Sequence, residues 1–254
     1  MDLTFFIGTL FFLIPYNLLM YGINDVFDYE SDLRNPRKGG VEGGLLPPEL
    51  HRITIIAAIV GCIPFLAYLL IVGDQWSQFW LLLTVFTVLA YSVPGLRFKE
   101  RPGIDSLTSA SHFVGPMLVG LTQAGAEFSS ELVFITLAFF LWGAASHAFG
   151  AVQDIAADRA AGIGSIAASL GAAWTSRIAF LLYLVAAFLL MPLPLPIPIA
   201  ALAVLPYALV AIRFVNLSDR DCEQANSGWR KFLLMNFFAG TVISLILAWI
   251  LRFG

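Results

Sequence analysis

Residues 3–32 read LTFFIGTLFFLIPYNLLMYGINDVFDYESD, a long apolar run that ends in a cluster of carboxylates. A helix needs ~20 apolar residues to cross the hydrocarbon layer of a membrane, and residues 3–23 supply that length. Ionisable groups at the end of a membrane helix are energetically costly and are usually functional. The stretch therefore predicts a membrane-spanning helix that ends in a functional acidic segment. The carboxylates of this segment are Asp25, Asp28, Glu30 and Asp32.

The composition of the whole chain agrees with a membrane protein. Of its 254 residues, 59% are hydrophobic and 12% are charged, whereas a soluble domain carries about 25% charged residues. We expect an all-α membrane protein, a transmembrane helical bundle of about eight spans that forms one domain over residues 1–254. A net charge of −3 gives no basic surface for nucleic acid. The expected spans are roughly 3–23, 52–73, 76–94, 107–124, 131–151, 173–192, 196–216 and 231–251.

Basic residues are distributed unevenly between the two ends of these spans. Every lysine and arginine except Arg252 falls on the side of the long polar connections. The positive-inside rule places that side in the cytoplasm. We therefore expect a multi-pass protein of a prokaryotic cell membrane, with its acidic segments facing the cytoplasm. The long polar connections are expected at 25–51, 95–106, 152–172 and 217–230.

Two acidic motifs share one spacing. Asn24, Asp28 and Asp32 lie at i, i+4 and i+8, and Asp154 and Asp158 lie at i and i+4. If both stretches are helical, each motif forms a stripe on one helix face. Two facing acidic stripes repel each other unless a cation lies between them. Mg²⁺ suits such an all-oxygen site and usually also binds the phosphates of a substrate, so these five residues are the predicted metal ligands. The glycines Gly162 and Gly164 are expected to turn the chain after the second motif.

Basic loops on the same side offer candidates for holding a diphosphate. The segment 91–102 reads YSVPGLRFKERP, and its Arg97 and Lys99 are candidates because fixed cations stabilise a leaving diphosphate. Ordinary positive-inside charge explains them about as well. The same ambiguity applies to three further candidates for substrate binding, Arg34, Arg37 and Lys38.

A histidine precedes the second motif within the same apolar span. His147 and Asp154 lie at i and i+7 and can share a helix face. His147 is therefore a candidate for contacting the substrate. A histidine hydrogen-bonded between two helices is the interpretation that we favour for it.

These motifs resemble the UbiA superfamily of intramembrane prenyltransferases. The resemblance lies in Asn24-x-x-x-Asp28-x-x-x-Asp32, Asp154-x-x-x-Asp158 and the loop from Tyr91 to Lys99. It implies a helical bundle around a central cavity, with a cytoplasmic cap over an Mg²⁺–prenyl diphosphate site. It also implies that both motifs hold the metal and the diphosphate and act in catalysis, with Lys99 and Tyr91 close by. A hydrophobic acceptor would come from the bilayer.

Within the superfamily, residues 21–32, 35–40 and 146–154 look like the lycopene elongase branch. That branch adds C5 units from dimethylallyl diphosphate to the ends of lycopene, and its members can work with partner carotenoid enzymes. The superfamily usually has nine spans, with the first Asp motif after the second span. Here the motif follows the first span, so the resemblance implies that one N-terminal helix is absent.

Other functions remain open from the sequence. The same chemistry can act on an aromatic acceptor, such as a quinone precursor or a tetrapyrrole. A cation-coupled transporter is a different class, but its ion site tends to lie at the membrane midplane, whereas these carboxylates gather near one membrane surface. Alcohol phosphotransfer from a nucleotide-activated lipid is disfavoured, because the Asp-Gly-x-x-Ala-Arg pattern expected for it is missing.

Overall fold

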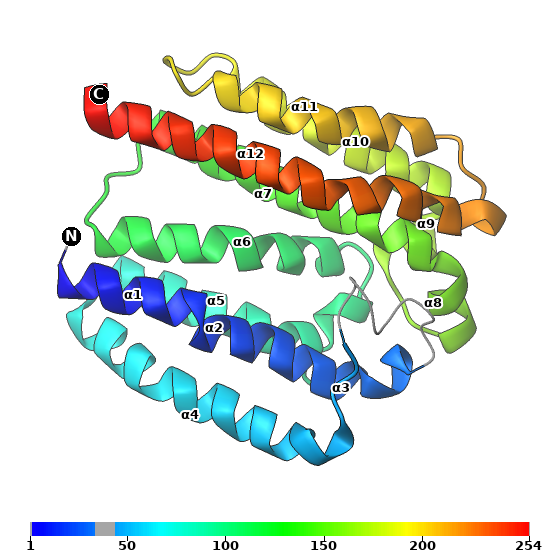
Figure 1. Ribbon diagram of the computed structural model, residues 1–254, viewed down its shortest axis with the longest axis horizontal. Coiled ribbons are helices and arrows are strands. Elements are labelled where there is room, and N and C mark those ends of the chain that lie inside the picture. Colours follow the sequence, from blue (N-terminus) through cyan, green and yellow to red (C-terminus); the bar gives the residue numbers. More distant parts are fainter. Residues whose placement is uncertain (1, 34–43, 254) are drawn as a thin grey trace. The chain divides into compact units, whose positions relative to one another are not determined.

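The computed structural model describes residues 2–33 and 44–253, and within these residues the secondary structure is helical with no strand (Figure 1). The α-helices are α1 (Leu3–Leu13), α2 (Pro15–Asn17), α3 (Ile23–Asp32), α4 (Pro48–Val72), α5 (Gln75–Ser92), α6 (Ile104–Gln123), α7 (Ser130–Ala151), α8 (Ile155–Ala161), α9 (Ile166–Leu170), α10 (Ala172–Leu190), α11 (Ile199–Ala211) and α12 (Asn226–Phe253). A π-helical turn, η1 (Leu18–Gly22), joins α2 to α3. The shorter 3₁₀ turns are η2 (Phe98–Glu100), η3 (Val152–Asp154), η4 (Ile212–Phe214) and η5 (Asp219–Ala225).

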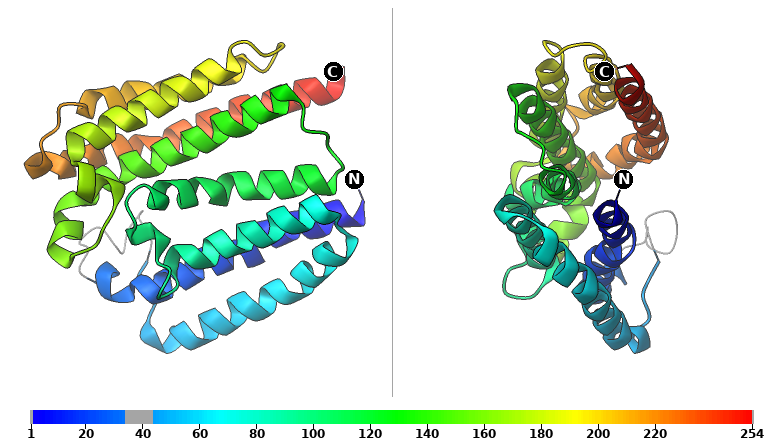
Figure 2. Two further views of the ribbon diagram at one scale, coloured as in Figure 1. Left: turned by 180° about the vertical axis from the view of Figure 1, so that it is seen from behind. Right: turned by 90° about the vertical axis from the view of Figure 1, so that its left-hand side faces the viewer.

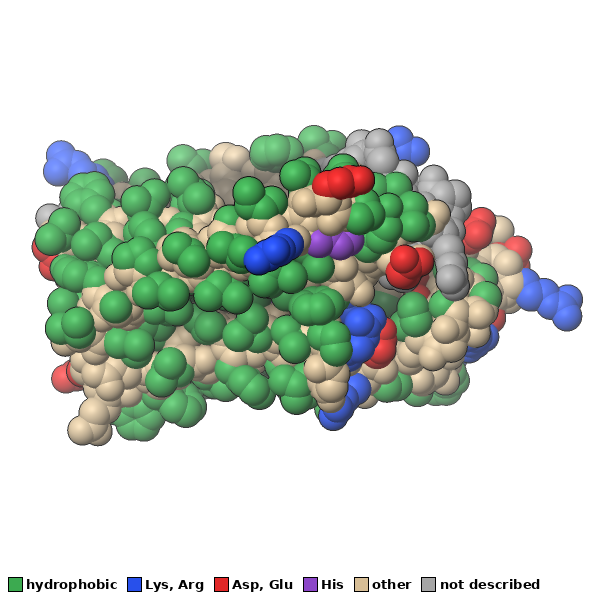
Figure 3. All heavy atoms as spheres, turned by 90° about the horizontal axis from the view of Figure 1, so that it is seen from below, with side chains coloured by type: hydrophobic (Ala, Val, Ile, Leu, Met, Phe, Trp, Pro, Cys, Tyr) green, Lys and Arg blue, Asp and Glu red, His purple; other side chains and the backbone are tan. Residues whose placement is uncertain are grey.

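The predicted fold class is confirmed. Among the described residues, five helical segments are long and apolar enough to cross a membrane: Leu3–Glu30, Pro48–Val72, Ser130–Ala161, Ala172–Leu190 and Asp219–Phe253. The other three expected spans are also helices, namely α5, α6 and α11. On the face drawn in Figure 3, hydrophobic side chains form a broad band, and most acidic and basic side chains lie to its right. This band suits a protein surrounded by lipid.

The chain divides into two compact units. The first comprises Met1–Lys99 and Ser111–Glu127, and its core is built around the buried side chains of Phe11, Leu69 and Leu81. The second comprises Glu100–Ala110 and Phe128–Gly254. Aromatic rings fill much of its core, including those of Phe149, Tyr183, Tyr207 and Phe232.

The helical stretch from Leu3 to Asp32 changes its winding twice before it reaches the first acidic motif. Pro15 begins a new helix because it has no N–H to donate. The side-chain amide of Asn17 donates to the carbonyls of Phe12 and Leu13, at 2.9 and 3.0 Å. The π-helical turn η1 follows directly.

The helix then continues through the motif, whereas the sequence had suggested a loop from residue 25. The stretch packs along α4, which lies beside it in both views of Figure 2. At Gly22 this approach is so close that an added Cβ would lie 2.9 Å from the methyl carbon of Thr54. The predicted loops 152–172 and 217–230 are likewise largely helical, as η3, α8 and α9 and as η5 with the start of α12.

Candidate active site

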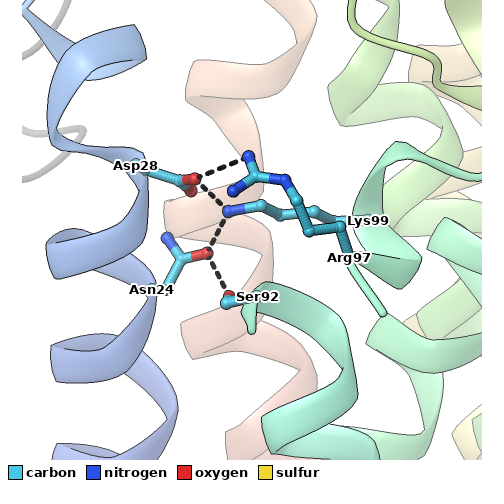
Figure 4. A network of polar contacts seen from close by, with 5 residues as sticks. All are labelled: Asn24, Asp28, Ser92, Arg97 and Lys99. Carbon is cyan, nitrogen blue, oxygen red and sulfur yellow. Dashed lines mark hydrogen bonds and ion pairs between the residues drawn. The ribbon is translucent and has the colours of Figure 1, made fainter. Parts of the chain in front are cut away.

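The first acidic motif forms one side of a compact polar cluster in the first unit (Figure 4). Asn24 and Asp28 lie one turn apart on α3, so both side chains point to the same side. Lys99 contacts both of them: its ammonium forms an ion pair with Asp28 and donates to the amide oxygen of Asn24 at 3.1 Å. The hydroxyl of Ser92 donates to that same oxygen at 2.9 Å. Arg97 forms a second ion pair with Asp28, with 3.7 Å between Nη2 and Oδ1.

A tight loop turns both cations back toward α3. Helix α5 ends before Val93, which has the extended backbone expected of a residue that precedes proline. Gly95 follows with φ +92°, and Arg97 has φ +40°. A positive φ is uncommon and strained for a residue with a side chain, and such residues gather at functional sites. This strained backbone conformation places Arg97 and Lys99 beside Asp28.

The charges of this cluster are largely shielded from solvent. The side chains of Lys99 and Asp28 are 11% and 14% exposed, and that of Arg97 is 28% exposed. Buried charges are costly unless they are paired and hydrogen-bonded. These charges are paired here, and a polyanion entering the cluster would meet two fixed cations next to a carboxylate and an amide oxygen.

The donor set of this cluster fits Mg²⁺ in one particular way. Asn24 and Asp28 offer oxygen ligands, which Mg²⁺ prefers. Within the described residues, no group of three or more His, Cys, Asp or Glu side chains is arranged to hold a metal ion. Mg²⁺ is usually held by one or two carboxylates together with substrate phosphates and water. The cluster thus suits a metal that arrives with a diphosphate.

Of the other residues predicted for the site in the first unit, the structure describes Tyr91 and Asp32. Tyr91 lies next to Ser92 on α5, and its ring meets that of His112 edge to face, with 5.2 Å between centroids. Asp32 lies one turn beyond Asp28 at the end of α3. Three predicted substrate-binding residues, Arg34, Arg37 and Lys38, lie outside the described residues.

Ser92 was missed by sequence reasoning. It is 1% exposed and belongs to an apolar helix, where a lone serine looks like a packing residue. Its position directly after Tyr91, at the last turn before the basic loop, was the available signal.

The second acidic motif lies in the second unit. Asp154 ends the 3₁₀ turn η3, and Asp158 lies on the short helix α8. Both carboxylates are half-buried, and Ser165 Oγ donates to Asp158 Oδ2 at 2.9 Å. The convergence of the two motifs on one metal stays a prediction.

The two glycines after this motif have different roles. Gly162 has φ +69° and ends α8 in the left-handed conformation that glycine favours, as predicted. Gly164 is needed for a close approach, because an added Cβ would lie 2.5 Å from the carbonyl oxygen of Glu100.

His147 is held between two helices of the second unit. It lies on α7, and its Nδ1 shares a hydrogen bond of 3.0 Å with Ser106 Oγ on α6. This is the interpretation that the sequence favoured. A contact between His147 and substrate stays a prediction.

A cavity of about 780 Å³ opens in the first unit, near the start of α1. Helices α1 and α6 supply most of its walls, including Gly8, Phe12, Val119 and Gly120. Asp2 and Gln123 add polar groups to the lining. The polar cluster lies at the opposite end of the stretch that runs from α1 to α3.

Comparison with known proteins places the chain in a family. The model described as "UbiA prenyltransferase family" matches residues 1–249. Fold and family match together define a multi-pass membrane prenyltransferase. The chain belongs to the UbiA prenyltransferase family.

Individual relatives show which branch of the family the chain resembles. A lycopene elongase/hydratase of Corynebacterium glutamicum is 52% identical over 246 residues, which are 97% of this chain and 86% of that protein. The C(50) beta-cyclic carotenoids biosynthesis protein LbtBC of Dietzia sp. is 51% identical, over 98% of this chain but 58% of that longer protein. The expected resemblance to the lycopene elongase branch is confirmed.

A solved structure supports the fold. The UbiA homolog from Archaeoglobus fulgidus bound to DMAPP and Mg²⁺ is similar with a TM-score of 0.62 and 21% identity. The match covers 96% of this chain and 88% of that one. At this identity the likeness bears on the fold alone.

Proposed function

We propose that this chain transfers a C5 prenyl group from dimethylallyl diphosphate (DMAPP) to the ends of lycopene, with Mg²⁺ as cofactor. The observation that carries the proposal is the cluster of Asn24, Asp28, Arg97 and Lys99, which combines oxygen ligands with two shielded cations. One relative described as a lycopene elongase/hydratase and one described as a C(50) beta-cyclic carotenoids biosynthesis protein, each at about half identity over nearly the whole chain, support the acceptor.

The reaction begins with heterolysis of the allylic C–O bond. The bonding electrons leave with the diphosphate, and an allyl cation remains. Mg²⁺, which Asn24 and Asp28 would help to hold, would supply Lewis-acid stabilisation of the charge that develops on the diphosphate. Lys99 and Arg97 donate to the same leaving group, and their ion pairs with Asp28 keep both cations in place before the substrate binds.

The acceptor then forms the new bond. The terminal double bond of the polyene attacks the allyl cation, one C–C bond forms, and a tertiary cation results. This cation is discharged by losing a proton, for which the diphosphate is a sufficient base, or by taking up water. A dry apolar environment protects the allyl cation from capture by water before the acceptor attacks.

The proposal gives roles to the other predicted residues. Asp32, Asp154 and Asp158 complete the metal and diphosphate ligands, and Tyr91 acts close to them. Asn24 orients the diphosphate through its amide. We assign further substrate contacts to Arg34, Arg37, Lys38 and His147.

The cavity near the start of α1 supports a long acceptor. It is largely apolar and lies at the opposite end of the stretch from α1 to α3 from the polar cluster, and we propose that it holds the far end of the polyene whose near end reacts. We propose that the acceptor enters from the bilayer and that the polar cluster faces the cytoplasm, in accord with the basic residues on that side. Partner carotenoid enzymes would take up the product.

Carotenoid profiling by mass spectrometry tests this function. Expression in a lycopene-producing host should yield C45 and C50 products, and the Asp28→Ala and Asp154→Ala variants should yield neither. In membranes, release of inorganic diphosphate from DMAPP should depend on lycopene. Release that depends instead on 4-hydroxybenzoate would identify an aromatic acceptor, and absence of release with either acceptor would refute the function.

A further inference from the structure

A buried carboxylate lies outside the proposed ligand set. Asp105 is in the first turn of α6, within the part of that helix that belongs to the second unit. It is 0% exposed. A carboxylate in such surroundings is costly unless hydrogen bonds compensate it, so the partners of Asp105 indicate what it does.

Both oxygens of Asp105 accept a backbone N–H. Oδ1 accepts from Ser106 at 2.8 Å, within its own helix. Oδ2 accepts from Ile166 at 2.7 Å, across 61 positions of sequence. Ile166 is the first residue of α9, directly after the segment that follows the second acidic motif. Asp105 therefore ties that segment to the start of α6.

Ser165 connects the hydrogen bond between Asp105 and Ile166 to the second acidic motif. Its hydroxyl donates to Asp158 Oδ2 at 2.9 Å and accepts from the N–H of Ala168 at 3.0 Å. A continuous path of hydrogen bonds and one peptide link thus runs from Asp105 through Ile166 and Ser165 to Asp158. A shift of the main chain at Ile166 would carry the Ser165 hydroxyl with it.

The same segment is held closely a few residues earlier. Gly164 lies so near the carbonyl of Glu100 that no side chain fits there. Ser106, whose N–H is bound by Asp105, also bonds to His147 of α7 through its hydroxyl. Residues just before and at the start of α6 therefore contact the segment after the second motif at two places. Glu100 meets Gly164, and Asp105 accepts from Ile166.

We propose that Asp105 is a positioning residue for prenyl transfer, which fixes the segment after the second motif so that Ser165 holds Asp158 in its orientation for the diphosphate. This inference rests on the proposed function, which makes Asp158 a ligand of the metal and the diphosphate. In this role Asp105 acts through Ile166 and Ser165 on Asp158.

The chemistry of Asp105 makes Asp105→Asn a sharp test. Asparagine has nearly the same shape but one acceptor oxygen, so one of the two N–H groups would face an NH₂ group. The expected first result is structural: hydrogen exchange of the peptide covering residues 155–170 should be at least tenfold faster without substrate or metal. The expected second result is kinetic, namely a roughly tenfold higher KM for DMAPP with a smaller change in kcat.

Asp74→Asn is the matched control. Asp74 also accepts a backbone N–H at a helix start, from Ser77 at 2.8 Å, but it caps α5 at the end away from Ser92. Asparagine is an equally good N-cap. Exchange of residues 155–170 and the KM for DMAPP should therefore stay as in the wild type. An Asp105→Asn variant that matched this control in both measurements would overturn the proposal.

Ser165→Ala provides a second route if Asp105→Asn does not fold. It removes the hydroxyl that joins the segment to Asp158 and leaves Asp105 in place. KM for DMAPP should rise as in Asp105→Asn, and where both variants fold the double variant should be no worse than either, because both act through one path. An unchanged KM in Ser165→Ala, or additive effects in the double variant, would contradict the proposal.

Asp158→Asn separates this inference from the proposed function. An Asp158→Asn variant with wild-type turnover and KM would remove Asp158 from the site and defeat the proposed ligand set. An inactive Asp158→Asn variant, combined with wild-type exchange and KM in Asp105→Asn, would defeat the positioning role alone.

Discussion

Ser92 donates its hydroxyl proton to the amide oxygen of Asn24 over 2.9 Å, so the last turn of α5 sets the orientation of an amide on α3. Lys99 donates to the same oxygen. Because both groups are donors, the amide oxygen faces α5 and the basic loop, and its NH₂ group points away from them. The first proposed ligand of the chain is therefore oriented by residues 68 and 75 positions distant in sequence.

Ser92→Ala should weaken substrate binding without unfolding the protein. Loss of one buried hydrogen bond costs about 1 kcal/mol, which corresponds to roughly a fivefold change in binding. We expect KM for DMAPP to rise by about that factor in a diphosphate-release assay. Ser77→Ala removes another buried hydroxyl from the far end of α5 and should leave KM unchanged. Equal effects of the two substitutions would show that Ser92 acts through general stability.

Lys99→Gln should nearly abolish turnover. The substitution removes a shielded cation and leaves Asp28 with Arg97 as its ion-pair partner in this cluster. Loss of a fixed charge that stabilises a leaving group typically costs 10²–10³ in rate, and we expect a loss of about that size in DMAPP-dependent diphosphate release. Lys231→Gln, at an exposed lysine of α12, is the control for loss of positive charge. Wild-type turnover in Lys99→Gln would exclude Lys99 from the leaving-group site.

Gly22→Ala should destabilise the first unit. Its Cβ would lie 2.9 Å from the methyl carbon of Thr54 and 3.3 Å from a methyl of Leu18. Overpacking of this kind costs roughly 1–3 kcal/mol, so we expect a lower melting temperature in detergent. Adding Thr54→Ser removes the nearer methyl and should restore part of the loss. Gly61→Ala, where an added Cβ has open space, should change little.

Gly120→Phe should separate ionisation of the donor from transfer to a long acceptor. An added Cβ at Gly120 has open space, and this residue lines the cavity near the start of α1. A phenyl ring there would occupy part of the cavity, which lies at the opposite end of the stretch from α1 to α3 from the polar cluster. C50 product should fall at least tenfold in carotenoid profiles, while KM for DMAPP stays within twofold. Gly61→Phe is the control, because Gly61 also has open space but does not line the cavity. A normal C50 yield from Gly120→Phe would show that the acceptor does not use this cavity.

The sequence predicted the parts of the site that rest on helical spacing. Asn24 and Asp28 share a face because they lie four residues apart. Arg97 and Lys99 of the basic loop were candidates for holding a diphosphate, although ordinary positive-inside charge explained them about as well. The same reasoning identified Gly162 as the end of a helix. Each of these expectations depends on neighbours along the chain and on simple electrostatics.

Other features depend on contacts that spacing does not report. The π-helical turn at Leu18–Gly22 depends on how the helix packs around Pro15 and against α4. Neither Ser92 nor Asp105 was singled out from the sequence. Their roles appear only when Asn24 and Ile166, distant in sequence, are found as their partners.

The π-helical turn makes the length of the segment between Pro15 and Asn24 as important as its composition. In such a turn one additional residue is accommodated within the helix. A regular α-helix over the same number of residues would instead rotate everything beyond the turn by about 100°. Asn24 and Asp28 would then point away from Ser92 and Lys99, although no side chain of the cluster had been altered. Homologous proteins that keep this cluster but wind this segment as a regular α-helix should therefore have one residue fewer between the equivalents of Pro15 and Asn24.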